Sequence, residues 1–418
     1  MLKNIRNFIK KYLMQLTEQH IIRTNEWRDW CVKAKNLYNQ VLYYWRQSMF
    51  KNIEYFTEYE ISGLFAEFNE ESFRALPSTT SQQIIRQVFH ITSSWKKAKK
   101  EYAKNPFKFT GKPKMPKYKK ELSELYFTSA QVKLKNGYAH FPQMIGGIVV
   151  KTNLKNIDCC RVIPKSNHFV VEFIYTIDDV VEKEYNNKVL GIDLGMNNLA
   201  ACITNIGQSF LINGKPLKSI NQFYNKKKAN LQSKLKSNIH SSKRIERLTF
   251  KRNSLIKNHL HNASKYIIDK AKELDISHIV IGNNKQWKTE INLGKKTNQN
   301  FVSIPHSYLI NQIEYKAKKA GIKVTTTEES YTSKCSFLDL EPIDKHEKYL
   351  GKRTKRGLFR TFTNRYINAD CNGAGNILRK VIGDFEINDS IERAASAPSK
   401  INVFEQNTLK SKKFINSF

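Results

Sequence analysis

Apolar side chains recur at helical spacing from about residue 24 to residue 104, and they form short alternating runs from residue 123 to residue 183. The first pattern predicts a helical module and the second predicts a β module. We expect the chain before residue 24 to begin the same strand-rich platform, with the helices inserted into it. The predicted bounds are 1–23 and 119–186 for the β module and 24–118 for the helical module.

A longer mixed domain is predicted from residue 187 to residue 384. Its apolar runs predict three strands, one very long basic helix from about residue 225 to residue 274, and then alternating strands and helices. This order is expected of a ribonuclease H-like α/β fold. The sequence therefore predicts a multidomain α+β protein that carries this α/β domain in its C-terminal half. Residues 385–418 are polar and weakly patterned, and we expect them to be partly disordered.

Asp193 is the single acid in the strand VLGIDL, between Gly191 and Gly195. A carboxylate on a central strand is costly unless it is paired or binds a cation. The two glycines would leave the backbone open to a large substrate. The alternative is a structural aspartate that accepts hydrogen bonds from backbone amides at the strand end.

Asp370 lies in INADCNGAGNI, at the start of a predicted helix. By itself such an aspartate is typically a helix N-cap. Together with Asp193 it could complete a carboxylate cluster that holds two divalent ions, which activate water and stabilise the leaving oxygen in phosphodiester hydrolysis. Mg²⁺, or Mn²⁺ in its place, suits oxygen ligands in such an open site.

The chain carries 71 Lys and Arg against 37 Asp and Glu, a formal net charge of +34. A polyanionic partner explains this excess, because basic side chains near phosphates release condensed counterions. The 19 Tyr and 24 Phe offer stacking surfaces for bases. The alternative is a generally basic surface without a nucleic-acid partner.

Two segments concentrate this charge. Eleven lysines lie between Trp95 and Lys120, interleaved with aromatic residues and prolines, and the long predicted helix is also basic. A solvated linker and a solvated helix face are the respective alternatives. The candidate nucleic-acid-binding residues, including a third basic run, are Lys96, Lys97, Lys99, Lys100, Lys112, Lys114, Lys117, Lys119, Lys226, Lys227, Lys228, Lys243, Arg244, Arg247, Lys352, Arg353, Lys355 and Arg356.

Four segments together resemble a known family. GIDLGMNNLA, ISHIVIG, EESYTSKCS and INADCNGAGNI, in this order, resemble the RuvC motifs of TnpB proteins, the transposon-encoded RNA-guided nucleases, and of compact type V CRISPR effectors. The resemblance implies that Asp193 and Asp370 are the first and third RuvC aspartates of a single DNA-cleaving site. It also implies a guide RNA and target double-stranded DNA as partners. By the same analogy, the β module is wedge-like and the helical module serves recognition.

The family's second motif normally ends in glutamate, whereas here the strand HIVIG ends in Gly282. The neighbouring strand GIKVTTT runs into Glu328 and Glu329, and strand ends in such a sheet lie close together. We therefore expect either Glu328 or Glu329 to act as the third catalytic and metal-binding carboxylate. The alternative is that this acid has been lost, which would leave a nuclease-inactive, RNA-guided DNA-binding protein. An unguided RuvC-like resolvase or transposase is a third hypothesis.

Relatives often carry two CxxC pairs before the last aspartate, a spacing that binds structural zinc. In that interval this chain has only Cys335 and Cys371, with His346 as a stray candidate. We expect no structural zinc, a degenerate ribbon region at about 332–366, and a positioning role for KYLGKRTKRGLFR. No run of 18 apolar residues occurs, so we expect no membrane partner and a location in the prokaryotic cytosol, with the nucleoid.

Overall fold

The computed structural model describes residues 13–51, 56–165, 167–178, 181–283 and 304–403. It divides into two compact units, Met1–Asp179 (unit 1) and Val180–Phe418 (unit 2). This division falls slightly before the boundary that we expected at residue 186. Each unit has its own hydrophobic core and is described by itself.

Unit 1 is built on an antiparallel sheet with the strand order β1-β7-β6-β2. Its strands are β1 (Leu13–Ile22), β2 (Leu125–Thr128), β6 (Cys159–Pro164) and β7 (Phe169–Asp178). Because β1 pairs with β7, the chain before the helices and the chain after them form one sheet, as the sequence predicted. A smaller antiparallel sheet contains β3 (Lys133–Lys135), β4 (Tyr138–His140) and β5 (Val149–Lys151).

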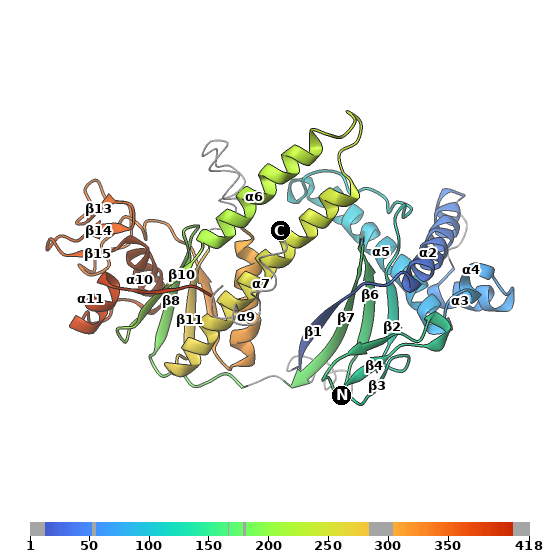
Figure 1. The fold of residues 1–418 in the computed structure, drawn as a ribbon, viewed down its shortest axis with the longest axis horizontal. Helices are drawn as coiled ribbons and strands as arrows, with labels where there is room; N and C mark the ends of the chain where they lie inside the picture. The colour runs from blue at the N-terminus through green and yellow to red at the C-terminus, as the bar shows by residue number, and fades with distance from the viewer. Residues whose placement is uncertain (1–12, 52–55, 166, 179–180, 284–303, 404–418) are drawn as a thin grey trace. The chain divides into compact units, whose positions relative to one another are not determined.

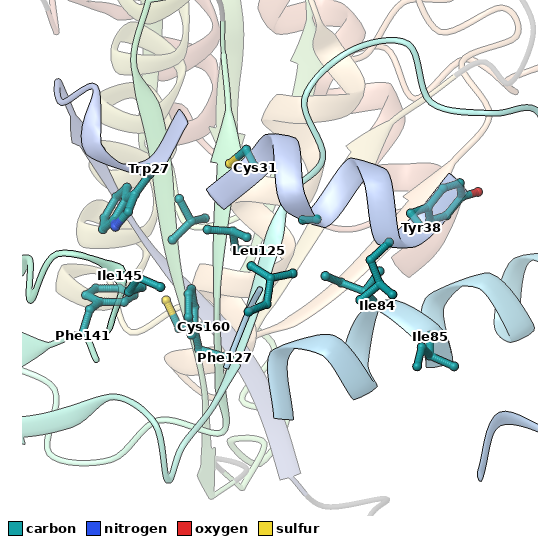
Figure 2. Packing of buried hydrophobic residues seen from close by; sticks show 14 of the residues in the cluster. Trp27, Cys31, Tyr38, Ile84, Ile85, Leu125, Phe127, Phe141, Ile145 and Cys160 are labelled. Atoms are coloured by element: carbon teal, nitrogen blue, oxygen red, sulfur yellow. The ribbon is translucent and has the colours of Figure 1, made fainter. Parts of the chain in front are cut away.

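The helices of unit 1 lie between β1 and β2 in the chain (Figure 1). They are α2 (Glu26–Phe50), α3 (Glu58–Glu67), α4 (Glu71–Arg74), α5 (Ser78–Lys104) and the short 3₁₀ helix Pro106–Lys108. A second 3₁₀ helix, Gln143–Ile145, lies between β4 and β5. Figure 2 shows Leu125 and Phe127 of β2 among the buried side chains that include Ile84 of α5. Trp27 of α2 packs against Phe141, with ring centroids 5.2 Å apart. The helical stripe predicted from the sequence therefore covers the sheet.

Unit 2 contains a six-stranded sheet with the order β12-β11-β8-β9-β10-β16. The strands are β8 (Val189–Leu194), β9 (Asn198–Thr204), β10 (Ser209–Asn213), β11 (His278–Gly282), β12 (Lys323–Thr327) and β16 (Ser399–Ile401). β8, β9 and β10 are antiparallel, whereas β11 pairs in parallel with both β8 and β12. This is the predicted ribonuclease H-like order.

The helices of unit 2 cover both faces of this sheet. They are α6 (Lys215–Gln232), α7 (Lys243–Glu273), α9 (His306–Lys319), α10 (Ala369–Ile382) and α11 (Asp389–Ser396). Leu190 and Ile192 of β8 share a core with α7 and α9, whereas Gly191 faces α10, where an added Cβ would lie 2.5 Å from the Ala374 carbonyl oxygen (Figure 1). Because side chains alternate between the two faces along a strand, Asp193 lies on the same face of β8 as Gly191 and points toward α10.

One expectation for unit 2 was wrong. The single helix expected over 225–274 is two helices, because α6 ends at Gln232 and α7 begins at Lys243. The hydroxyl of Ser242 caps α7 by accepting a hydrogen bond from the Ile245 amide at 3.3 Å, which favours a new helix start there. Within residues 385–418, which we expected to be partly disordered, the structure contains α11 and β16, and β16 pairs in parallel with β10. The rest of that tail, 404–418, lies outside the described residues.

A three-stranded antiparallel sheet precedes α10. It contains β13 (Lys352–Lys355), β14 (Leu358–Arg360) and β15 (Tyr366–Asn368). This sheet carries the last predicted basic run and ends one residue before α10, so it lies next to Asp370 in the chain. Within the described ranges, no helix combines the length and apolar character needed to cross a membrane.

Candidate active site

Asp193 is positioned by β8 and faces the N-terminal half of α10 at Gly373. A Cβ added to Gly373 would lie only 2.7 Å from Asp193 Oδ2, so the glycine lets the helix pass close to the carboxylate. Burial, then the charges of Glu329 and Asp370, raise the pKa of Asp193 well above its usual range, and the Arg353 guanidinium opposes them. Among the described residues, no backbone hydrogen bond contributes to this shift, so the structural alternative of an aspartate bound by backbone amides gains no support from it.

Asp370 lies at the start of α10, but it does not cap the helix. Asn368 is the N-cap, because its Oδ1 accepts the backbone amides of Asp370 at 3.0 Å and Cys371 at 3.1 Å. The Asp370 carboxylate is left for other partners. Its Oδ2 accepts a hydrogen bond of 2.7 Å from Asn198 Nδ2, and Arg353 Nη2 lies 3.4 Å from its Oδ1.

Glu329 follows β12 and turns back over the end of β11. A Cβ added to Gly282 would lie 2.7 Å from both Cγ and Oε1 of Glu329, so the Glu329 side chain occupies the space beside that glycine. Burial raises the pKa of Glu329 to about 7, against the opposing charge of Lys380. The Lys380 ammonium also donates a hydrogen bond of 3.1 Å to the Glu328 carbonyl, which ties α10 to this loop.

Glu328 points elsewhere. It is exposed, and its carboxylate accepts a hydrogen bond from the Ser330 hydroxyl. Of the two glutamates offered by the sequence, only Glu329 contributes to the electrostatic environment of Asp193. The structure therefore places the charges of Glu329 and Asp370 in the electrostatic environment of Asp193 and leaves Glu328 outside it.

The chemistry of these three carboxylates fits a divalent cation. Mg²⁺ and Mn²⁺ prefer oxygen ligands, and a cation would offset both the burial and the repulsion from Glu329 and Asp370 that raise the pKa of Asp193. In the described ranges, however, no three His, Cys, Asp or Glu side chains stand close enough together to bind one ion. The three residues therefore suit a divalent cation by their oxygen ligands and their combined negative charge, although the described side chains do not form a coordination shell.

In the ribbon region at about 332–366, which we expected to lack zinc, the side chains of two acids, rather than the cysteines, connect the separate segments. Glu341 is buried, and its carboxylate accepts the amides of Ser336 at 2.6 Å and Leu350 at 2.8 Å. Asp339 Oδ2 accepts the Ser336 hydroxyl at 2.5 Å and the Phe362 amide at 2.7 Å. We call Asp339 and Glu341 the carboxylate clasp; it joins the turn at Ser336 to the segments on either side of the β13–β14 hairpin.

The three stray zinc candidates have separate partners. Cys335 Sγ donates to the Asp344 carbonyl at 3.6 Å, and His346 Nε2 lies 2.8 Å from the Pro342 carbonyl. Cys371 is buried on α10, and burial raises the pKa of its thiol. The absence of structural zinc stays a prediction.

Most of the candidate nucleic-acid-binding residues are exposed on α5, on the arm that follows it, on α6 and α7, and on β13 and its turn. Lys119 differs. Its ammonium donates to Ser123 Oγ at 2.7 Å and Gln87 Oε1 at 3.2 Å, and it lies 4.1 Å from the ring centroid of Tyr38. Burial lowers the pKa of Lys119. These contacts give Lys119 a structural role, because they hold the basic arm on α2 and α5.

Sequence reasoning missed Asn198, which contacts Asp370 from β9. It also missed that Arg353, predicted only to bind nucleic acid, reaches the Asp370 carboxylate. An asparagine in an apolar strand and an arginine in a basic run give no local signal of such contacts. Their roles depend on the pairing of segments far apart in the chain.

Two protein families and one known protein are similar in sequence to the region that carries the four motifs. The OrfB_IS605 family, described as a probable transposase, matches residues 172–288, and the Cas12f1-like TNB domain family matches residues 306–377. A TnpB-like protein, ORF457 of Acidianus two-tailed virus, is 29% identical over 258 residues, with coverage of 59% of this chain and 50% of that protein. The chain therefore spans about half the length of this curated relative.

Two solved structures resemble this chain at low sequence identity. A Cas12f1–sgRNA–target DNA complex matches with 17% identity and a TM-score of 0.37, over 87% of this chain and 98% of that chain. The mini-RNA-guided endonuclease CRISPR-Cas_phi3 matches with 10% identity and a TM-score of 0.48, over 92% of this chain and 95% of that chain. The sequence matches confirm the expected resemblance: the region that carries the four motifs is TnpB-like.

Proposed function

We propose that the chain is an RNA-guided DNA endonuclease with a single RuvC-type site formed by Asp193, Glu329 and Asp370. The observation that carries the proposal is the position of Glu329 beside Gly282, because it supplies a third carboxylate where the second motif lacks one. The net charge of +34 and the sequence similarity to a TnpB-like protein support guide RNA and target DNA as the partners.

The three carboxylates would hold Mg²⁺ or Mn²⁺, which supplies activation of water and stabilisation of the leaving oxygen during phosphodiester hydrolysis. The residues around them have separate tasks. Asn198 fixes one oxygen of Asp370 through its 2.7 Å hydrogen bond. Arg353 balances part of the negative charge in the absence of a cation and presents a guanidinium to the DNA backbone. Gly373 keeps α10 close enough for Asp193 and Asp370 to share the site.

Matched glutamine variants test the third carboxylate. Glu329→Gln should abolish target cleavage by the RNA-bound protein, whereas Glu328→Gln, one residue away and exposed, should cleave at the wild-type rate. Asp193→Ala and Asp370→Ala should also abolish cleavage while they retain guide and target binding. Cleavage by Glu329→Gln at the wild-type rate would contradict the proposed site.

Extraction of nucleic acid from the purified protein tests guidance separately. A discrete copurifying RNA supports an RNA-guided protein, and its absence supports the unguided resolvase or transposase hypothesis. A wild-type protein that binds this RNA and its matched target, yet leaves the DNA intact with either Mg²⁺ or Mn²⁺, would support the nuclease-inactive alternative.

A further inference from the structure

A pocket of about 650 Å³ opens beside Asp370 within unit 2. Its walls come from the β8–β9 turn, the end of β10, the start of α6, the β13–β14 hairpin, the end of β15 and the edge strand β16. Asp370 is the sole acid among the lining residues, and four basic residues face it from three distant segments. These are Lys215, Arg353, Arg356 and Lys400. The pocket therefore favours an anionic ligand that approaches the candidate active site.

The backbone at the start of α6 packs closely against the β8–β9 turn. A Cβ added to Gly214 would lie 2.4 Å from the Met196 carbonyl oxygen, so the start of α6 is pressed against the β8–β9 turn. Asn213 Oδ1 accepts the Lys215 amide at 3.0 Å and holds the first residue of the helix. The partial positive charge at this helix N-terminus adds to the charge of Lys215.

The opposite edge is formed by β16, which lies within the polar segment 385–418. Lys400 of β16 pairs with Leu211 of β10, and its side chain is exposed. Asn402 follows the strand and lines the pocket; its Oδ1 is buried and has no hydrogen-bond partner among the described residues. This acceptor is available to a donor on a ligand, such as an N–H group of a base.

We propose that this pocket binds a short stretch of single-stranded nucleic acid on one side of Asp370 and so positions the strand that is cut. The inference rests on the proposed function and deepens it. Pockets of roughly 300–1,000 Å³ enclose small organic ligands, which include a dinucleotide, whereas a duplex does not fit, since its major groove alone is about 12 Å wide. Lys215, Arg356 and Lys400 bind the phosphates, and Asn402 accepts a hydrogen bond from the strand.

The pocket would orient the bound strand relative to the active site. A phosphodiester held on one side of the carboxylates cannot slide along the site, so the bond presented to Asp370 is fixed before the reaction. Lys215 and Lys400 carry this role without touching the three carboxylates of the proposed active site, so their removal separates strand positioning from metal binding.

The test compares two double variants that lose the same charge. Lys215→Ala/Lys400→Ala removes basic residues from the pocket, and Lys272→Ala/Lys319→Ala removes exposed ones that do not line it. The RNA-bound protein is assayed for single-turnover cleavage and for target-duplex binding. The pocket variant should cleave about tenfold more slowly, because each lost phosphate contact weakens binding, while duplex-target binding stays at the control level.

A binding assay needs no catalysis. A short fluorescein-labelled oligothymidylate is titrated into the RNA-bound full-length protein in EDTA, and Lys400→Glu should weaken binding more than Lys400→Ala. A pocket variant that cleaves and binds like the control variant overturns the pocket assignment and leaves the proposed function intact. A wild-type protein that cuts no target DNA contradicts the proposed function instead, and the oligothymidylate titration then decides the pocket assignment by itself.

Discussion

The side chain of Glu329 packs against the Cα atom of Gly282, where a Cβ would come within 2.7 Å of its Cγ and Oε1 atoms. Parallel pairing of β11 with β12 aligns Gly282 with Thr327, so the chain two residues later can turn back across the neighbouring strand end. Gly282 has no side chain, and the space that this leaves at the end of β11 is therefore occupied by the carboxylate of Glu329, which follows β12.

This arrangement predicts the effect of exchanging the two positions. A Cβ at position 282 would lie 2.5 Å from Ile377 Cδ1 and 2.7 Å from Glu329 Cγ, so Gly282→Ala should displace Glu329 and stop cleavage, with a stability cost of about 1–3 kcal/mol for overpacking. Gly282→Glu/Glu329→Ala should recover part of the activity that Glu329→Ala loses, because the carboxylate returns to the same space from β11. Single-turnover cleavage measures both effects, and thermal unfolding monitors the fold. A Gly282→Ala variant with wild-type cleavage would show that this contact does not position Glu329.

Asn198→Ala removes the 2.7 Å hydrogen bond to Asp370 Oδ2. Loss of a residue that orients a metal-binding carboxylate typically costs about 10–100-fold in metal affinity or activity. We expect weaker Mn²⁺ binding by electron paramagnetic resonance titration and a higher Mg²⁺ concentration for half-maximal cleavage. Asn197→Ala is the matched control, since Asn197 accepts a hydrogen bond from Lys218 rather than contacting Asp370. Equal Mn²⁺ affinities in the two variants would count against an orienting role for Asn198.

The carboxylate clasp should stabilise the ribbon region without a metal. Glu341→Gln places an amide NH₂ group against one of the two backbone amides that the carboxylate accepts, at a cost of about 1–3 kcal/mol in the free energy of unfolding. Glu347→Gln, on an exposed residue of the same segment, should leave it unchanged. The melting temperature of the wild type should not shift when a zinc chelator is added. A large chelator-dependent decrease would reveal a structural metal.

Lys117 and Lys119 should respond differently to alanine substitution. Lys119 donates hydrogen bonds to Ser123 and Gln87, so Lys119→Ala should lower the melting temperature of the protein. Lys117 is exposed, so Lys117→Ala should preserve the fold and reduce the salt dependence of nucleic-acid binding by about one phosphate contact. Circular dichroism melts and binding at several salt concentrations measure the two effects. The reverse pattern would mean that Lys119, not Lys117, contacts the backbone.

Sequence periodicity predicted the sheet of unit 2 because apolar runs of five to seven residues bury both faces of β8, β9 and β11. The expectation that Asp193 and Asp370 lie near each other followed from that order of strands and helices. The choice between Glu328 and Glu329 did not, because successive residues point in opposite directions and the register of the turn after β12 decides which one faces Gly282. The break between α6 and α7 was missed because the basic pattern continues across it, although the Ser242 cap is visible in the sequence.

The last prediction concerns the stability of unit 2 in mild acid. His259 of α7 is buried and bonds through Nε2 to the Asn213 carbonyl at 3.2 Å, which requires the neutral ring to donate from this nitrogen. Burial lowers the pKa of His259 to about 4, although the bond to Asn213 acts in the opposite direction. The unfolded chain, with an ordinary histidine pKa of about 6.5, takes up the proton first as the pH falls. The stabilising contribution is therefore complete above pH 6.5 and is lost progressively as the pH falls toward about 4.

His259→Gln keeps a side-chain donor for Asn213 but removes the titrating ring. The free energy of unfolding of the variant should fall less than that of the wild type between pH 6.5 and pH 4.5, by at most about 2–3 kcal/mol, since each unit of pKa difference corresponds to about 1.4 kcal/mol. Denaturant titrations at several pH values measure this difference, and carboxylates that titrate in both proteins cancel in the comparison. Parallel curves for the wild type and His259→Gln would mean that the ring at position 259 is protonated as readily in the folded protein as in the unfolded chain.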